Sequence, residues 1–192
     1  MEQIPYRQLA GGLIHLANAT RPDIHFAANL LSCFCSDSGS THWKAAKRVH
    51  RYLKGTANLG ISYVKQSQCM RCFVGADWAG DTDKRKSSRG YLLLSAAGPM
   101  SWATKKQKSV ASSIMEAEHM GLSEVTKEVI HMRRLINSMG FGKLVENRTV
   151  IFCENQSAIH LSKNFVYHGR SKHIHTRYHF TREAQHNNLI EI

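Results

Sequence analysis

The sequence lacks a long apolar run, a recognisable leader and an internal repeat. No stretch of about eighteen or more apolar residues is present, so we expect neither a transmembrane helix nor a membrane partner. Residues Met1 to Tyr6 do not combine a basic segment with a following apolar one, and therefore no signal peptide is expected. These absences predict an intracellular protein, cytoplasmic or nuclear.

Acidic residues are scarce relative to basic ones. The chain has 14 Asp and Glu against 26 Lys and Arg, a formal net charge of +12 with histidine neutral. Such an excess concerns partners rather than fold, and nucleic acid is the polyanion that best complements it. A basic surface that only keeps the protein dissolved would have the same charge, so composition leaves both interpretations open.

Cysteine is also scarce, and its number is odd. Five cysteines without a secretory signal do not predict a disulfide framework, so we expect reduced thiols. Cys69 and Cys72 form a C-x-x-C pair, and His175 and His179 lie four residues apart. These residues leave a structural zinc domain as a minor alternative.

The first part of the chain, residues 1–66, is predicted to be a helical domain. Apolar residues recur on one face of a helix predicted over 6–19, at Leu9, Leu13 and Leu16. A second helix is predicted to begin with Thr20 as its cap and Pro22 in its first turn, and to include Cys33 and Cys35. A third is predicted from residue 40 or 41 to Gly55.

The spacing of apolar residues is no longer helical after residue 60, and residues 67–192 are predicted to be a second domain. Short segments of β-branched and aromatic residues predict strands over 72–77, 91–95, 100–103, 148–154 and 189–192. Helices are predicted over 113–139, 156–163 and 171–186. This order predicts an α/β fold, with a mixed five-stranded sheet and flanking helices.

Glu118 is the first candidate for a catalytic carboxylate. It begins a stripe whose members are three or four residues apart on one helical face: Glu118, Leu122, Val125, Val129, Met132 and Ile136. The stripe should pack on the sheet, whereas Glu116 should lie on the solvated side with Met120, Ser123 and Lys127. A glutamate at the polar edge of the stripe, favoured by the helix dipole, is an equally good interpretation.

Asp77 and Glu154 are the other candidate carboxylates, because each ends a predicted strand. Metal-dependent phosphodiester hydrolases gather several carboxylates around divalent ions, which activate water and stabilise the leaving oxygen. A turn aspartate and a helix-capping segment explain Asp77 and Glu154 as well when each is taken singly. The order strand, helix, strand makes the three more informative together.

Five blocks of the sequence are distinctive, and they occur in this order: Gly75-Ala76-Asp77-Trp78-Ala79-Gly80-Asp81, Arg85 to Tyr91, Met115-Glu116-Ala117-Glu118-His119, Glu154-Asn155-Gln156-Ser157 and His168 to Glu183. Together they resemble, in colinear order, the ribonuclease H region of copia-type retrotransposon Pol polyproteins. Blocks before residue 66 resemble the end of the preceding reverse transcriptase: Tyr6-Arg7-Gln8-Leu9, Thr20-Arg21-Pro22-Asp23-Ile24 and His42 to Arg48. The reverse transcriptase portion of the same polyprotein is therefore an expected partner.

The resemblance implies hydrolysis of the RNA strand of an RNA–DNA hybrid with two Mg²⁺ ions and four acidic residues. The implied metal ligands and catalytic residues here are Asp77, Glu118 and Glu154. The family strand reads Asp-Ala-Asp-Trp-Ala-Gly, and Gly75 replaces the first aspartate, which we take as the catalytic one. Glu154 replaces an aspartate, and Ile192 ends the sequence before the fourth acid. We therefore expect impaired cleavage; a catalytically inactive nucleic-acid-binding remnant is the alternative.

Basic residues gather in two segments that are candidate phosphate contacts. One lies in and before the helix predicted over 171–186, and the other follows a predicted strand. The candidates are Arg170, Lys172, His173 and Arg177, with Lys105 and Lys106. A solvated basic face is the alternative for both segments.

Overall fold

The computed structural model describes residues 5–65, 69–78, 86–107, 109–163 and 172–192, with the side chains of 172–178 excepted. The chain forms two compact units. One comprises residues 1–62 with 102–104, and the other comprises 63–101 with 105–192. Each unit is described by itself. No helix in the described part is both long and apolar enough to cross a membrane.

The first unit is built from helices α1 (Tyr6–Ala19), η1 (Pro22–Ile24), α2 (His25–Ser32) and α3 (Ser40–Gly55). The predicted positions of α1 and α3 are confirmed. Two details were wrong: Thr20 caps the end of α1 rather than beginning the next helix, and α2 ends before Cys33. Cys33 is therefore the cap residue at the end of α2, and Cys35 lies beyond that end.

Apolar faces of α1, α2 and α3 form the core of this unit. Ala10 and Ala28 are fully buried, and Leu13 is 2% exposed. Ala46 is the fully buried residue that α3 contributes, with Val49 and Leu53 packed beside it. Several of these buried residues are alanines, whose small side chains let helices pack closely.

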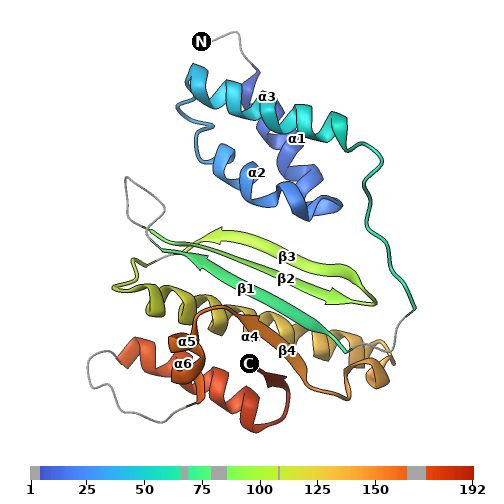
Figure 1. Cartoon of the computed structure of the whole chain (residues 1–192), viewed down its shortest axis with the longest axis vertical. Coiled ribbons are helices and arrows are strands. Elements are labelled where there is room, and N and C mark those ends of the chain that lie inside the picture. Colours follow the sequence, from blue (N-terminus) through green and yellow to red (C-terminus); the bar gives the residue numbers. More distant parts are fainter. Residues whose placement is uncertain (1–4, 66–68, 79–85, 108, 164–171) are drawn as a thin grey trace. The chain divides into compact units, whose positions relative to one another are not determined.

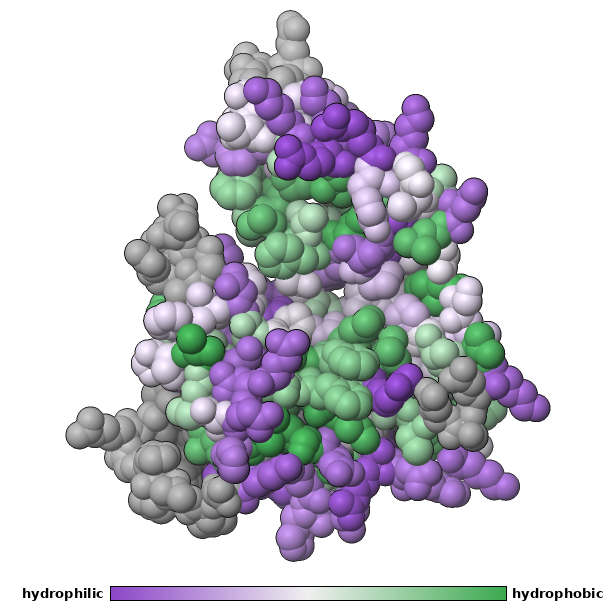
Figure 2. Space-filling view, viewed as in Figure 1, coloured by the Kyte–Doolittle hydropathy of each residue, from purple (hydrophilic) through white to green (hydrophobic). Residues whose placement is uncertain are grey.

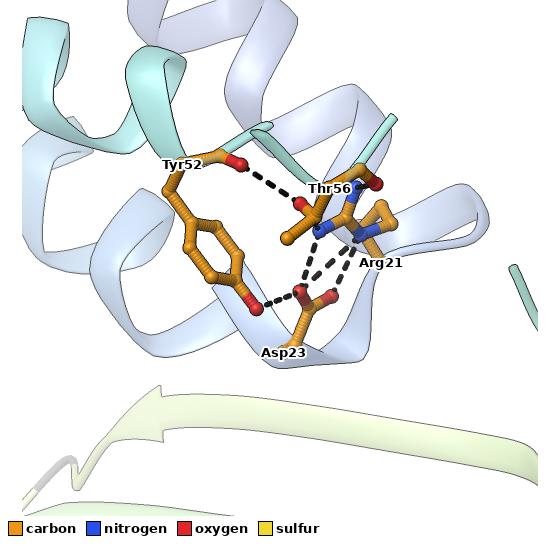
Figure 3. A network of polar contacts seen from close by, with 4 residues as sticks. All are labelled: Arg21, Asp23, Tyr52 and Thr56. Carbon is orange, nitrogen blue, oxygen red and sulfur yellow. Dashed lines mark hydrogen bonds and ion pairs between the residues drawn. The ribbon is translucent and has the colours of Figure 1, made fainter. Parts of the chain in front are cut away.

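A polar network joins the end of α3 to the turn before α2 (Figure 3). The Arg21 guanidinium donates to Asp23 Oδ2 at 2.7 Å and to Thr56 Oγ1 at 2.7 Å. Tyr52 Oη donates to Asp23 Oδ2 at 2.9 Å. These bonds raise the pKa of Arg21 and lower that of Asp23, with the Arg21–Asp23 hydrogen bond as the main cause in both. The charge of Arg21 is thus compensated inside the unit.

The second unit is a mixed five-stranded sheet with helices (Figure 1). Its strands are β1 (Arg71–Asp77), β2 (Ser88–Ser95), β3 (Gly98–Lys106), β4 (Thr149–Cys153) and β5 (Ile190–Glu191), in the order β3-β2-β1-β4-β5. Strand β1 pairs antiparallel with β2 and parallel with β4, which is itself parallel to β5. The helices are α4 (Ile114–Ser138), η2 (Gly142–Val145), α5 (Gln156–Lys163) and α6 (Lys172–His186). This arrangement confirms the predicted fold class and is consistent with a ribonuclease H-like fold.

Helix α4 packs along the sheet and closes its core. Leu122, Val125 and Val129 join Cys72, Val74 and Ile151 in one buried cluster. The predicted stripe from Glu118 to Ile136 is confirmed, since five of its six members are buried and Met132 is partly so. Glu116, which was expected to be solvated, is partly buried, and Met120 and Ser123 on the same side of the helix are buried. The first half of α4 is covered on most sides.

The turn between β2 and β3 has an uncommon backbone. Ala96 (φ 50°) and Ala97 (φ 61°) both adopt left-handed conformations. Positive φ at both central residues is the pattern of the tight turns that match the twist of a hairpin. Alanine is a costly choice there, because its Cβ crowds the carbonyl in this region.

Candidate active site

The carboxyl ends of β1 and β4 meet at one edge of the sheet. The two strands are parallel, and Val74 is the register partner of Cys153. One residue further along, Gly75 is therefore level with Glu154, whereas Asp77 lies two residues beyond Gly75, roughly 6.5 Å along the strand. Position 75, rather than 77, lies beside the glutamate that follows β4.

Glu118 reaches this edge from the first half of α4. Its side chain is buried, with 9% exposure, and it accepts a hydrogen bond from the Ala76 backbone amide. Burial raises the pKa of Glu118, the Ala76 hydrogen bond lowers it, and the negative charge of Glu154 raises it further. No hydrogen-bond donor in the described part of the chain reaches its buried Oε2. This oxygen is therefore buried without a partner among the described residues.

Glu154 and Cys153 complete the group around Glu118. Burial raises the pKa of the Cys153 thiol; the Asn155 backbone lowers it, and the charges of Glu118 and Glu154 raise it. The two carboxylates therefore act on the same thiol and on each other. Glu154 itself is exposed, because it directly follows the last residue of β4. Sequence reasoning gave Cys153 no part here, and its position between two acids becomes visible only in the fold.

Asp77 ends β1 opposite Ser88 of β2, and its side chain is exposed. Across the described ranges, no group of three or more His, Cys, Asp or Glu side chains is spaced to hold a metal ion. Glu118 and Glu154 are therefore near enough for the charge of one to raise the pKa of the other, and the described residues do not make a metal-binding cluster of those two with Asp77. The role of Asp77 stays a prediction.

Gly75 lies in open space. A Cβ atom built on it would meet no atom within 4 Å, and its cross-strand partner on β2 is another glycine, Gly90. The structure therefore has room for a side chain at position 75, although glycine supplies none. Gly75 and Glu154 both line an open hollow of about 580 Å³ on the sheet, beside the stacked rings of Phe73 and Phe152.

The predicted phosphate contacts are only partly described. Lys105 and Lys106 end β3, and both are exposed. Arg170 lies outside the described residues. Lys172, His173 and Arg177 belong to the first half of α6, where the described structure extends only to the helix itself. The basic character of this region stays a sequence-based prediction.

The zinc alternative gains no support from the described thiols. All five cysteines are free, and Cys72 is buried in the sheet core, where burial raises the pKa of its thiol to about 12. A thiol with such a pKa is a poor source of the thiolate that binds metal. His179 is exposed on α6, and His175 lies in the part of α6 whose side chains are not described.

Comparison with known proteins places the chain among transposon polyproteins. It is 42% identical over 183 residues to the retrovirus-related Pol polyprotein from transposon TNT 1-94 of Nicotiana tabacum, which is 95% of this chain. It is 38% identical over 188 residues to the Pol polyprotein from transposon RE2 of Arabidopsis thaliana, which is 97% of this chain. Over most of its length, the chain is homologous to a region of copia-type retrotransposon Pol polyproteins. No family model matches it.

The chain spans only a small part of the length of those relatives. It spans 14% of the TNT 1-94 polyprotein and 13% of the RE2 polyprotein. A shorter relative is named Secreted RxLR effector protein 161, from Plasmopara viticola. It is 42% identical over 131 residues, which cover 68% of this chain and 92% of that protein. Sequences of this kind therefore also occur in a protein shorter than a polyprotein.

Proposed function

We propose that this Pol region is a ribonuclease H-like domain whose reaction is hydrolysis of RNA in RNA–DNA hybrids, and that its activity is impaired. The observation that carries the proposal is the buried Glu118 carboxyl. One of its oxygens has no partner in the described structure, and the negative charge of Glu154 raises its pKa. Burying a carboxyl oxygen without a partner costs free energy. A role in the carboxylate site that the resemblance implies therefore explains the burial of Glu118 better than a contribution to stability does.

The magnesium implied by the resemblance fits this donor set only in part. Carboxylate oxygens are the ligand type that Mg²⁺ prefers. The described residues bring two such groups together, and two-metal catalysis requires more. At position 75 the native sequence has a glycine and therefore no carboxylate to bind the metal. This missing ligand contributes to the expected loss of activity.

Restoring a carboxylate at position 75 tests the proposal. We expect Gly75→Asp to cleave the RNA strand of a labelled hybrid in the presence of Mg²⁺, at least tenfold faster than the native chain. Native protein and Gly75→Asp/Glu118→Gln should both stay near background. Gly75→Asp/Glu154→Asp restores both altered acids. If neither this variant nor Gly75→Asp cleaves faster than the native chain while folded and bound to the hybrid, the hydrolase proposal is wrong.

A second readout does not depend on turnover. An added carboxylate at position 75, beside Glu154, crowds negative charge, so metal-free Gly75→Asp should unfold at a lower temperature than the native chain. A divalent cation that binds the folded site stabilises it by mass action. Mg²⁺ should therefore raise the melting temperature of Gly75→Asp more than that of the native protein. Asn187→Asp adds the same charge in the exposed turn before β5, by the amino end of β4 rather than its carboxyl end, and serves as the matched control.

A non-enzymatic nucleic-acid-binding remnant is the second candidate function. Replacement of the first aspartate by Gly75 favours it for the native sequence, because the fold and the +12 charge are retained without the full set of acids. Hybrid binding by native protein that shows no Mg²⁺-dependent cleavage would support this candidate.

A further inference from the structure

Helix α3 presents a row of cations on one face. Lys44, Lys47, Arg48, Arg51 and Lys54 follow one another closely along the helix, within the spacing of its turns, and all five are exposed. At about 100° per residue they occupy roughly a third of the helix circumference. We call these five residues the α3 basic stripe.

The opposite face of α3 is committed to the core. Ala46 is fully buried, and Trp43, Val49 and Leu53 pack against α1 and α2. Figure 2 shows hydrophilic side chains gathered over α3 and apolar side chains over the helices next to it. The helix therefore offers charge to a partner, without a free apolar face.

Few acidic groups compensate the stripe within its own segment. Helix α3 contains no Asp or Glu, and residues 5–62 contain only Asp23 and Asp37. Asp23 is held by Arg21 and Tyr52, as Figure 3 shows. That network also joins the end of α3 to the neighbouring turn, so the stripe stands on a fixed helix.

We propose that the α3 basic stripe binds the phosphate backbone of a nucleic-acid duplex. Ten residues separate its ends, about 15 Å along the axis, and a duplex carries one negative charge per about 1.7 Å. A duplex can therefore offer phosphates to all five cations. The proposed function names the polyanion, an RNA–DNA hybrid, and this inference rests on it for that identity.

An anionic membrane is the competing partner for a basic helix. Helices that bind at membrane surfaces insert an apolar face beneath the headgroups. The apolar face of α3 is already covered by α1 and α2, so only the charge term would remain. This favours the nucleic acid.

The salt dependence of binding tests the stripe. Full-length protein is titrated onto a labelled RNA–DNA hybrid over a range of salt concentrations. Each phosphate contact contributes about 0.9 to the slope of log affinity against log salt, so Lys47→Gln/Arg48→Gln/Arg51→Gln should lose about 2.7 of it. A milder variant, Lys44→Gln/Lys54→Gln, should lose about 1.8 and decides the matter if the triple variant misfolds.

The matched control removes the same charge from the second unit. Arg134→Gln/Lys143→Gln/Arg148→Gln changes three exposed cations, and its slope should stay within about one of the native value. Equal losses in the two triple variants, or an unchanged slope in both stripe variants, would overturn the inference. So would stripe-dependent binding to phosphatidylserine vesicles with unaltered hybrid binding.

The two proposals fail in different ways. If neither Gly75→Asp nor Gly75→Asp/Glu154→Asp cleaves the hybrid but the salt slopes change as expected, only the hydrolase proposal is rejected. If one of these two variants is active but the stripe variants keep the native salt slope, only the proposal for the α3 basic stripe is rejected.

Discussion

At the scale of single residues, the site depends on one carboxyl group that the fold withdraws from water. Glu118 holds its proton to a higher pH in the folded chain, because burial and the charge of Glu154 disfavour its ionised form. Between its unfolded and folded pKa values the folded state binds more protons, so its stability falls as pH rises through that window. The penalty is absent below the unfolded value, about 4.3, and complete above the folded one.

Glu118→Gln should therefore stabilise the metal-free protein at pH 7.5. The amide oxygen can still accept the Ala76 hydrogen bond, and no ionisation remains to be penalised. The gain in melting temperature over the native chain should shrink toward pH 4, where both side chains are neutral. A difference independent of pH would mean that Glu118 ionises as freely in the folded chain as in the unfolded one.

Sequence reasoning found Glu118 because helical spacing is local information. The stripe from Leu122 to Ile136 fixes which face of α4 packs inward, and Glu118 lies in line with it. The sequence could not predict that Gly75 lies level with Glu154, because this depends on the register between strands far apart in sequence. The unpartnered oxygen of Glu118 likewise depends on packing from several elements.

At the scale of elements, the turn between β2 and β3 is the place where local sequence disagrees with the backbone. Ala96 and Ala97 give no hairpin signal, since asparagine and glycine are the usual residues of such turns. The sequence predicted two strands here but not the geometry of their connection. Long helices such as α3 and α4 were predicted well because their patterns repeat over several turns.

Ala97→Gly should stabilise the chain by about 0.5–1 kcal/mol. Glycine relieves the left-handed strain and gives back part of the gain through its more flexible unfolded state. Ala45→Gly, on the exposed side of α3, is the control and should destabilise by about 1 kcal/mol. Urea denaturation of both variants measures the difference, and a loss of stability in Ala97→Gly would contradict the assigned turn.

At the scale of the whole molecule, the chain has separate cores. Leu13 belongs to the helical cluster of the first unit, and Leu122 belongs to the cluster under the sheet. The predicted domain boundary after residue 66 stays a prediction. Composition could not supply it, because both segments are rich in basic and apolar residues alike.

Leu13→Ala and Leu122→Ala should each cost about 2–5 kcal/mol, since both side chains are almost fully buried. Because they share no core cluster, their effects should add to within about 0.5 kcal/mol in the double variant. Calorimetry should show each substitution shifting a different part of the unfolding transition. Strong coupling between the two would mean that the cores unfold as one.

The open space at Gly75 has an evolutionary consequence. A defect that had been filled by a bulky side chain, or by a shifted strand, would need several compensating changes to reverse. Here the neighbouring backbone, the strand pairing and the buried acid all stand as they are, and the glycine opposite leaves room. If the proposed function holds, a lineage carrying this chain is a single amino-acid replacement away from regaining the missing acid at that strand.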